Sequence, residues 1–233
     1  MRSGLTESPL NPLPPVIWLL ALPAIASEAL FALGRAGFVG GAEGVGMRLS
    51  AIRLTAFPPE LAQRIWTLGA LDLDQLYRAF SFSFVHVSLM HALFVVVFTL
   101  ALGNMIAHSF RPWALLALFF GSAIGGALVY AAVVPWLGVR AAPLIGGYPA
   151  VYGFVGAFTF LLWTRLAAQN ANRMRAFTLI GILLAFQLVF GLVFGGTGPG
   201  WIAEIAGFAC GFALSFLLVD GGARRALAQI RQR

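Results

Sequence analysis

The side chains best equipped for chemistry lie within or beside apolar stretches of the chain. They are two histidines, two tyrosines and one glutamate: His86, His91, Tyr148, Tyr152 and Glu204. Imidazole and carboxylate groups can exchange protons, and all five side chains can form hydrogen bonds. An ionisable group inside an apolar helix is costly, so Glu204 requires either a hydrogen-bond partner or a function.

These residues belong to three short motifs. The stretch "FVHVSLMHALFVVVF" contains His86 and His91, "GGYPAVYGFVGAF" contains both tyrosines, and "AEIAGFACGFALS" contains Glu204. In their order and spacing the motifs resemble those of the rhomboid intramembrane serine proteases, over roughly residues 80 to 219. The resemblance implies an all-α, polytopic membrane fold with a rhomboid-like bundle of six transmembrane helices.

The chain departs from the family's motifs at the positions that carry the family's chemistry. Tyr148 stands at the nucleophilic serine, and Pro149 stands at the glycine that follows it. Glu204 replaces the histidine base, and Val95 replaces an asparagine donor. Peptide hydrolysis by this route needs a serine nucleophile, a base and donors for the oxyanion. We therefore predict a pseudoprotease, a rhomboid-like protein that has no catalytic residue and is not an enzyme.

The former active site is the candidate binding site. It comprises His86, His91, Tyr148, Tyr152 and Glu204. The family geometry implies that the beginnings of the fourth and sixth helices come together. Because an unpaired carboxylate at that depth costs several kcal/mol, we expect Glu204 within hydrogen-bond or one-water reach of the Tyr148 hydroxyl.

Four glycines are expected to pack helices against each other. Gly153 and Gly156 lie on the fourth helix, and Gly207 and Gly211 lie on the sixth. Small residues let two helices approach closely in lipid, where van der Waals packing and hydrogen bonds drive association. The sequence therefore predicts a scaffold that is kept although the catalytic groups are replaced.

Binding is the function that these features favour. The protein is expected to hold a transmembrane segment of another protein, or to stabilise a membrane protein complex, through the face between the second and fifth helices. Membrane lipid and a transmembrane protein are the expected partners. The alternative is an active rhomboid-type protease with displaced catalytic residues. A small-molecule carrier is disfavoured, because internal repeats and paired broken helices are absent from the sequence.

Apolar helices must position these residues. Of 233 residues, 60% are hydrophobic and 10% are charged, and the mean hydropathy is +0.90, which places the chain in a bilayer. Apolar runs bounded by Arg, Pro and Gly predict six helices, at residues 14–33, 89–108, 113–134, 150–165, 175–195 and 201–219. The fourth is only about 24 Å long, so we expect it to begin below the membrane surface.

The remaining segments are expected to lie at or outside the membrane surfaces. Residues 34–88, between the first two helices, are too mixed in polarity to cross the bilayer and form a long interfacial loop with an amphipathic stretch from Pro59 to Gly69. Residues 14–219 form the membrane domain, between a tail at 1–13 and an Arg-rich tail at 220–233. Glu28 is expected to reach the surface from the end of its helix.

The net charge of +7 comes from arginines in loops and near the chain ends, a distribution that argues against nucleic-acid binding. Nine arginines lie on the side of the termini and six on the other. The positive-inside rule therefore predicts cytoplasmic termini. The expected location is the inner membrane of a bacterium. The single cysteine, Cys210, can form no disulfide within the chain, and we expect no metal and no cofactor.

Overall fold

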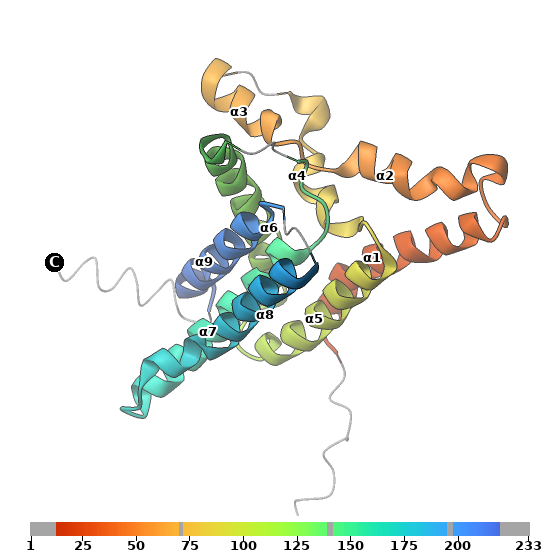
Figure 1. Ribbon diagram of the computed structural model, residues 1–233. Helices are drawn as coiled ribbons and strands as arrows, with labels where there is room; N and C mark the ends of the chain where they lie inside the picture. The colour runs from red at the N-terminus through yellow and green to blue at the C-terminus, as the bar shows by residue number, and fades with distance from the viewer. Residues whose placement is uncertain (1–12, 70–71, 139–141, 195–197, 220–233) are drawn as a thin grey trace, which may run out of the picture.

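The computed structural model describes residues 13–69, 72–138, 142–194 and 198–219, and these residues are predominantly helical (Figure 1). The α-helices are α1 (Pro15–Arg35), α2 (Met47–Thr55), α3 (Pro59–Leu68), α4 (Arg78–Ser81), α5 (Leu89–Ala107), α6 (Pro112–Val133), α7 (Tyr148–Ala168), α8 (Thr178–Phe194) and α9 (Trp201–Leu218). Short 3-10 helices lie between them: η1 (Gly41–Gly46), η2 (Leu73–Gln75), η3 (Phe82–Phe84), η4 (Val134–Leu137) and η5 (Arg173–Phe177).

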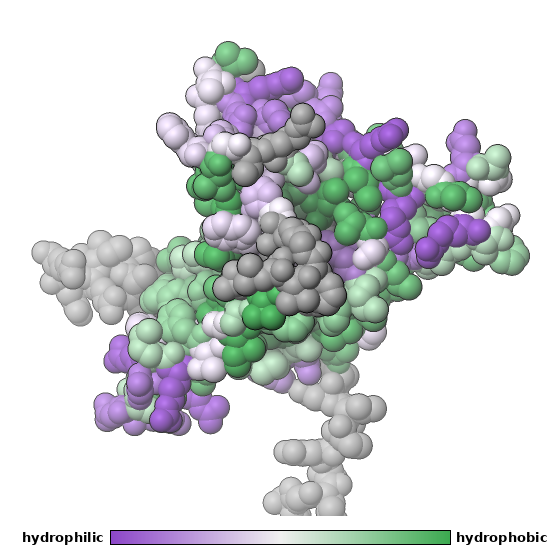
Figure 2. Space-filling view, in the orientation of Figure 1, coloured by the Kyte–Doolittle hydropathy of each residue, from purple (hydrophilic) through white to green (hydrophobic). Residues whose placement is uncertain are grey.

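The long helices form a membrane bundle. Within the described residues, α1, α5, α6 together with η4, α7 and α9 are long and apolar enough to cross a bilayer. Helix α8 has 17 apolar-rich residues, about 26 Å at 1.5 Å per residue, and is the sixth helix of the bundle. Figure 2 shows hydrophobic side chains over the middle of the molecule, between polar regions around α3 and around the turn that follows α7. The predicted all-α, polytopic six-helix fold is confirmed.

Proline and serine account for where several helices begin. Pro15, Pro112 and Pro149 each lie in the first turn of a helix, where the missing N–H would have no intrahelical partner. At the start of α5, the Ser88 hydroxyl caps the helix by accepting a hydrogen bond from the N–H of His91, at 3.2 Å. The residues of the candidate site thus lie next to defined helix starts.

The predicted short fourth helix was wrong. Helix α7 begins at Tyr148, two residues earlier than expected, because Pro149 fits within its first turn. It also continues to Ala168, since an arginine at position 165 does not end a helix. With 21 residues, α7 is about 31 Å long and matches the thickness of the hydrocarbon core.

Helices α6, α7 and α9 form the most closely packed part of the bundle. On α9, Gly207 lies against the backbone of Pro149. One turn later, Gly211 lies against the backbone of Gly153, and Gly156 of α7 packs on the backbone of α9 in the same way. A Cβ atom at any of these glycines would overlap backbone atoms of the facing helix, so the two helices are in direct main-chain contact.

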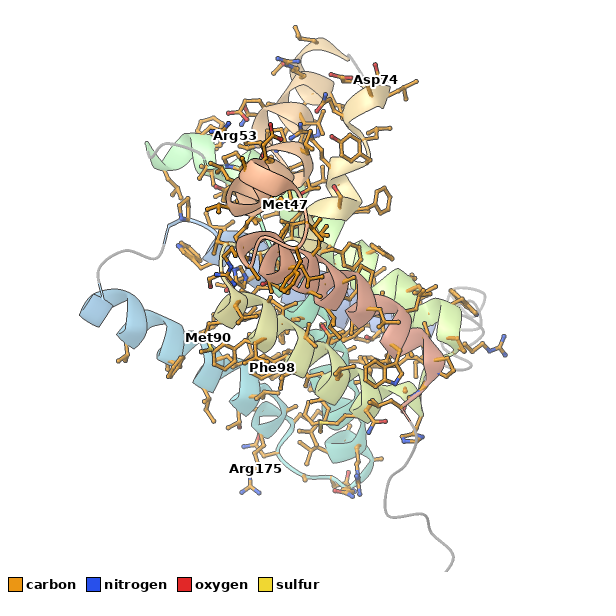
Figure 3. The ribbon with its side chains drawn as sticks, turned by 90° about the vertical axis from the view of Figure 1, so that its right-hand side faces the viewer. Met47, Arg53, Asp74, Met90, Phe98 and Arg175 are labelled. Carbon is orange, nitrogen blue, oxygen red and sulfur yellow. The ribbon has the colours of Figure 1, made fainter. Side chains whose placement is uncertain are left out.

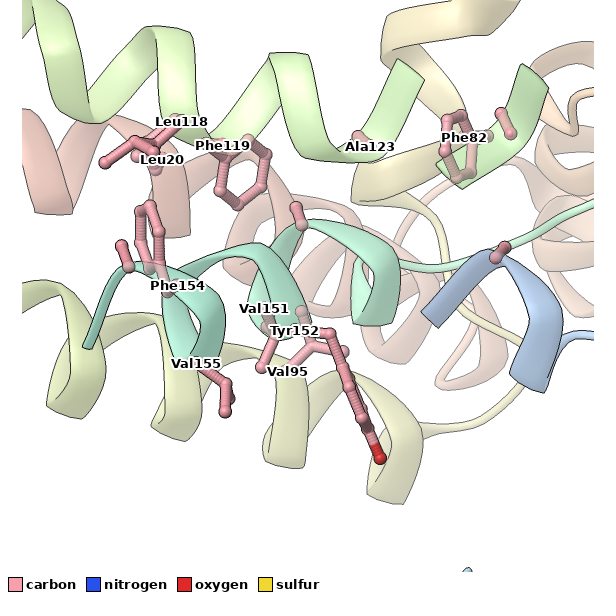
Figure 4. Close-up of a cluster of buried hydrophobic side chains, with 14 of the residues drawn as sticks. Leu20, Phe82, Val95, Leu118, Phe119, Ala123, Val151, Tyr152, Phe154 and Val155 are labelled. Atoms are coloured by element: carbon pink, nitrogen blue, oxygen red, sulfur yellow. The ribbon is translucent and has the colours of Figure 1, made fainter. Parts of the chain in front are cut away.

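Aromatic side chains fill the space between α6 and α7 (Figure 4). The rings of Phe119 and Phe154 meet edge to face, with centroids 5.9 Å apart. Leu20 of α1 and Leu118 of α6 lie beside them, and all four side chains are buried. These contacts fix α1, α6 and α7 relative to one another, below the beginning of α7.

The segment between α1 and α5 is folded. The amphipathic stretch expected at Pro59–Gly69 folds as helix α3 (Pro59–Leu68), which ends at a left-handed Gly69. Leu61 of this helix is buried against the bundle, whereas Leu68 is exposed. Glu28 was expected at the surface, but it is buried and paired with Arg48 of α2, so that expectation was wrong.

Helix α8 lies beside α5 and α7 in both views of the ribbon (Figures 1 and 3). It packs loosely, since Ile182 and Val189 are 60% and 58% exposed. On α5, Met90 is also exposed, and Figure 3 shows it on the side toward α8. The α5 and α8 side of the bundle therefore presents apolar side chains to the surrounding membrane.

Candidate functional site

His86 lies at the end of the segment that leads from η3 into α5, and its side chain is fully buried. Its Nε2 atom accepts a hydrogen bond from the N–H of Gly147, at 3.3 Å. The proton of the neutral ring must then be on Nδ1, a buried atom with no hydrogen-bond partner in the described structure. Burial, together with the charges of His91 and Arg48, lowers the pKa of His86 from 6.5 to about 3, so the ring is neutral at physiological pH.

Three aromatic rings form a continuous stack at the beginning of α7. The His86 and His91 rings meet edge to face, with centroids 5.0 Å apart. The ring of Tyr148 lies nearly parallel to that of His91, at 4.7 Å and an angle of 18°. Tyr148 thus packs its ring directly on the second histidine of the pair.

Two glycines make room for this stack. Gly146 has a φ of +96°, a left-handed conformation that residues with a side chain rarely adopt. A Cβ atom at Gly146 would also lie 2.5 Å from Cε1 of His91. At Gly147, a Cβ atom would lie 2.7 Å from Cγ1 of Val95. The histidines and Val95 therefore pack onto bare backbone just before α7.

Val95 makes an apolar wall beside this backbone. It is buried on α5, and Figure 4 shows it next to Val151 and Tyr152 of α7. An asparagine at this position would place a donor beside Gly147, whereas valine offers only methyl groups. The substitution predicted to remove a donor thus lies in direct contact with the site.

Glu204 and Tyr152 complete the set of predicted site residues. Glu204 lies in the first turn of α9, near enough for its charge to act on the phenols of Tyr148 and Tyr152. The structure therefore places all five candidate binding residues around the beginnings of α5, α7 and α9. The hydrogen bond between Tyr148 and Glu204 stays a prediction.

The folded segment between α1 and α5 is joined to the site by backbone hydrogen bonds. Phe57 and Leu144 exchange two backbone hydrogen bonds, of 3.0 and 2.8 Å, which join this segment to the connection before α7. The N–H of Gly146 donates to the carbonyl of Phe82, at 2.8 Å. These bonds hold the two glycines of the site in place.

Several residues of the site were not found from the sequence. Gly146 and Gly147 are visible there as a glycine pair before a helix, but their φ angles and contacts are not. Ser83, whose carbonyl lies beside Gly147, carries a buried hydroxyl with no partner in the described structure. The position of Ser83 in the sequence relative to the histidines does not indicate that its carbonyl lies beside Gly147.

The polar atoms of the site are hydrogen-bonding groups. In the described part of the chain, no three His, Cys, Asp or Glu side chains are grouped so that they could hold a metal ion. His86 offers a buried donor, and His91 has a buried Nε2 without a hydrogen-bond partner in the structure. The phenols and the carboxylate add further polar groups, so the site can hold a polar group of a ligand within an apolar surround.

Comparison with protein families gives one match. Residues 73–221 match the family model described as the Rhomboid domain. The matched range contains every residue of the candidate site. No curated protein sequence matches the chain.

Proposed function

Because the chain belongs to the rhomboid family, we propose that it is a membrane protein that binds a transmembrane segment of a partner without cutting it. Rhomboids are normally intramembrane serine proteases, and the resemblance to their motifs places Tyr148 where the serine would be. The stack of Tyr148 on His91 carries the proposal, because the side chain at the motif position of the serine is a bulky phenol whose ring packs on a neighbouring histidine instead of presenting a serine hydroxyl to a base. Binding of this kind suits an adaptor or a subunit that stabilises a complex.

Two neighbouring positions support the loss of proteolysis. Pro149 has no N–H to donate toward an oxyanion, and Val95 offers only methyl groups beside Gly147. Glu204 stands where the motif has its histidine base. Without a nucleophile, that carboxylate has nothing to activate.

Labelling with a serine-reactive fluorophosphonate tests this proposal. The full chain, reconstituted in liposomes beside an active rhomboid protease as the positive control, should remain unlabelled and should leave transmembrane substrates intact. Labelling or specific cleavage would instead favour the alternative, a protease with displaced catalytic residues. The variant Ser83→Ala would then show whether the buried hydroxyl of Ser83, a residue whose carbonyl lies beside Gly147, had taken the role.

The proposed binding face lies between α5 and α8. Loose packing of α8 supports this choice, because an inserted helix could reach the site there without breaking the α6, α7 and α9 contacts. Photocrosslinkers at Phe94 of α5 and Ile182 of α8 should capture one discrete transmembrane protein from the native membrane. A crosslinker at Val129, an exposed residue of α6, is the matched control and should give fewer adducts. Equal adducts at all three positions, or adducts only with lipid, would remove the binding proposal.

We further propose that residues 14–219 form the membrane domain, that residues 34–88 lie in the interface, and that the protein lies in a bacterial inner membrane with both termini cytoplasmic. The tails at 1–13 and 220–233 fall almost wholly outside the described residues. Exposed apolar side chains of α2 and α3, such as Leu49 and Trp66, support contact with the interface.

A further inference from the structure

Arg48 joins three parts of the protein through one guanidinium group. Its two terminal nitrogens donate to the two carboxylate oxygens of Glu28, at 2.7 Å each, so the ion pair is bidentate. One of these nitrogens also donates to the backbone carbonyl of His86, at 2.7 Å. A planar guanidinium can make these bonds together because its donors are held in a fixed fork.

The surroundings of this ion pair are apolar. Glu28 is only 8% exposed on α1, and the guanidinium lies over the ring of Phe31, 4.8 Å from its centroid. A buried pair of this kind gives little net stability compared with an apolar pair, whereas removal of one partner leaves a buried charge and is costly. Its presence therefore calls for a role besides holding helices together.

A glycine crossing brings Arg48 to this place. At the end of α1, Gly34 lies against Gly44 of η1, and a Cβ atom at Gly44 would lie 2.5 Å from the carbonyl of Gly34. The chain thus turns back closely along α1 before α2 begins at Met47. Arg48, in the first turn of α2, then points across α1 toward the start of α5.

We infer that Arg48 is a positioning residue, which fixes the backbone at His86 and through it the ring stack of the candidate site. The chain of contacts is continuous. Arg48 holds the His86 carbonyl, the His86 ring accepts from the N–H of Gly147, and the same ring packs on His91, which packs on Tyr148. This inference concerns the shape of the site and holds whether the site binds or cuts, so its failure is separate from that of the proposed function.

Histidine NMR tests the inference in the full chain in detergent micelles. The protein has three histidines, and His108, at the other end of α5, is an internal control. In Arg48→Lys, which keeps the charge beside Glu28 but loses the fork, the ¹⁵N signals of His86 should move from one fixed neutral tautomer toward averaged tautomers. Amide exchange at Gly147 should rise at least about tenfold, the effect of losing roughly 1.4 kcal/mol of protection. The His108 signals should stay unchanged.

The double variant Glu28→Met/Arg48→Met removes both charges and keeps the volume, so the fold is expected to survive. It should show the same changes at His86 and Gly147. The control is Arg53→Met, which removes another arginine of α2 and should keep wild-type His86 signals. Wild-type His86 signals and Gly147 exchange in Arg48→Lys would overturn the inference, because Arg48 would then only fasten α2 to α1.

Discussion

The His86 ring owes its protonation state to its position between two segments of the chain. The backbone N–H of Gly147 donates a hydrogen bond to Nε2 of His86. Arg48 brings a positive charge close to the same residue. A second proton on the ring would break the hydrogen bond from the N–H of Gly147, and its positive charge would be repelled by the charge of Arg48. The ring can therefore be a fixed hydrogen-bond donor, but it is a poor proton acceptor.

This environment makes stability depend on pH in a defined direction. Since the pKa of His86 is about 3 in the folded state and 6.5 ordinarily, the unfolded chain binds the extra proton first. The contribution of His86 is complete above pH 6.5 and is lost as the pH falls toward 3. Thermal unfolding in detergent should show Tm falling less steeply with acidification in His86→Gln than in the wild type. His108→Gln should follow the wild type, and identical slopes in all three proteins would contradict the assignment.

At the scale of single residues, the sequence singled out candidate site residues but not the geometry in which they lie. The histidine pair, Tyr148 and Glu204 stood out because polar groups in apolar runs are costly. The structure brings them together around the starts of three helices. Arg48 could not have been chosen, because nothing in the sequence separates it from the other loop arginines. Its role depends on the crossing of Gly34 and Gly44, a contact between residues with no side chains to signal it.

Among the helices, the pair α7 and α9 is the least tolerant of added volume. The variant Gly211→Ala would place a Cβ atom within the backbone of Gly153, so the helices must separate. We expect a loss of about 3 kcal/mol in the free energy of unfolding, since overpacking of a well-packed core costs about 1–3 kcal/mol or more. Steric trapping in bicelles can measure this change.

The matched control is Gly181→Ala on α8, where a Cβ atom would meet nothing within 4 Å. Alanine is the better helix former by up to about 1 kcal/mol, so this variant should be neutral or slightly stabilising. Equal losses at positions 181 and 211 would show that the direct backbone contact is not what limits α9.

The first and last residues of a helix were predictable wherever an apolar run was just long enough to span the thickness of the bilayer. The predicted helices at 89–108, 113–134 and 201–219 agree with α5, α6 and α9 to within one residue at each end. The fourth was predicted too short, because proline was treated as a boundary although it fits within a first turn. The folded segment between α1 and α5 was largely missed. Its short helices are held by contacts with distant residues, such as the bridge between Phe57 and Leu144, and these leave no periodic pattern.

For the molecule as a whole, the polar side chains gather at two opposite ends. Figure 1 places η2 and α3 at one end and the turn between α7 and η5 at the other, and Figure 2 shows an apolar band between them. By the positive-inside rule, the arginines at the α7 end, including Arg173 and Arg175, favour the proposed orientation, in which this end is cytoplasmic.

Cysteine accessibility tests this orientation in a Cys210→Ala background. Leu73 and Met174 are both exposed and lie at the opposite ends. With an impermeant thiol reagent added to intact cells, Leu73→Cys should react and Met174→Cys should react only after permeabilisation. The reverse pattern would place the α7 end outside and overturn the predicted topology.

The close contact of α7 with α9 also has a consequence for biosynthesis. Helix α8 lies between them in the sequence, yet it packs at the edge of the bundle. The ribosome must therefore complete α8 before the groove formed by α6 and α7 can receive the helix that fills it. Until then, the backbone of α7 at Pro149 and Gly153 lacks the glycines of α9 that pack against it. Packing of the bundle is thus completed only when α9 inserts. Nascent chains stalled before that step would present an open groove to chaperones and membrane proteases.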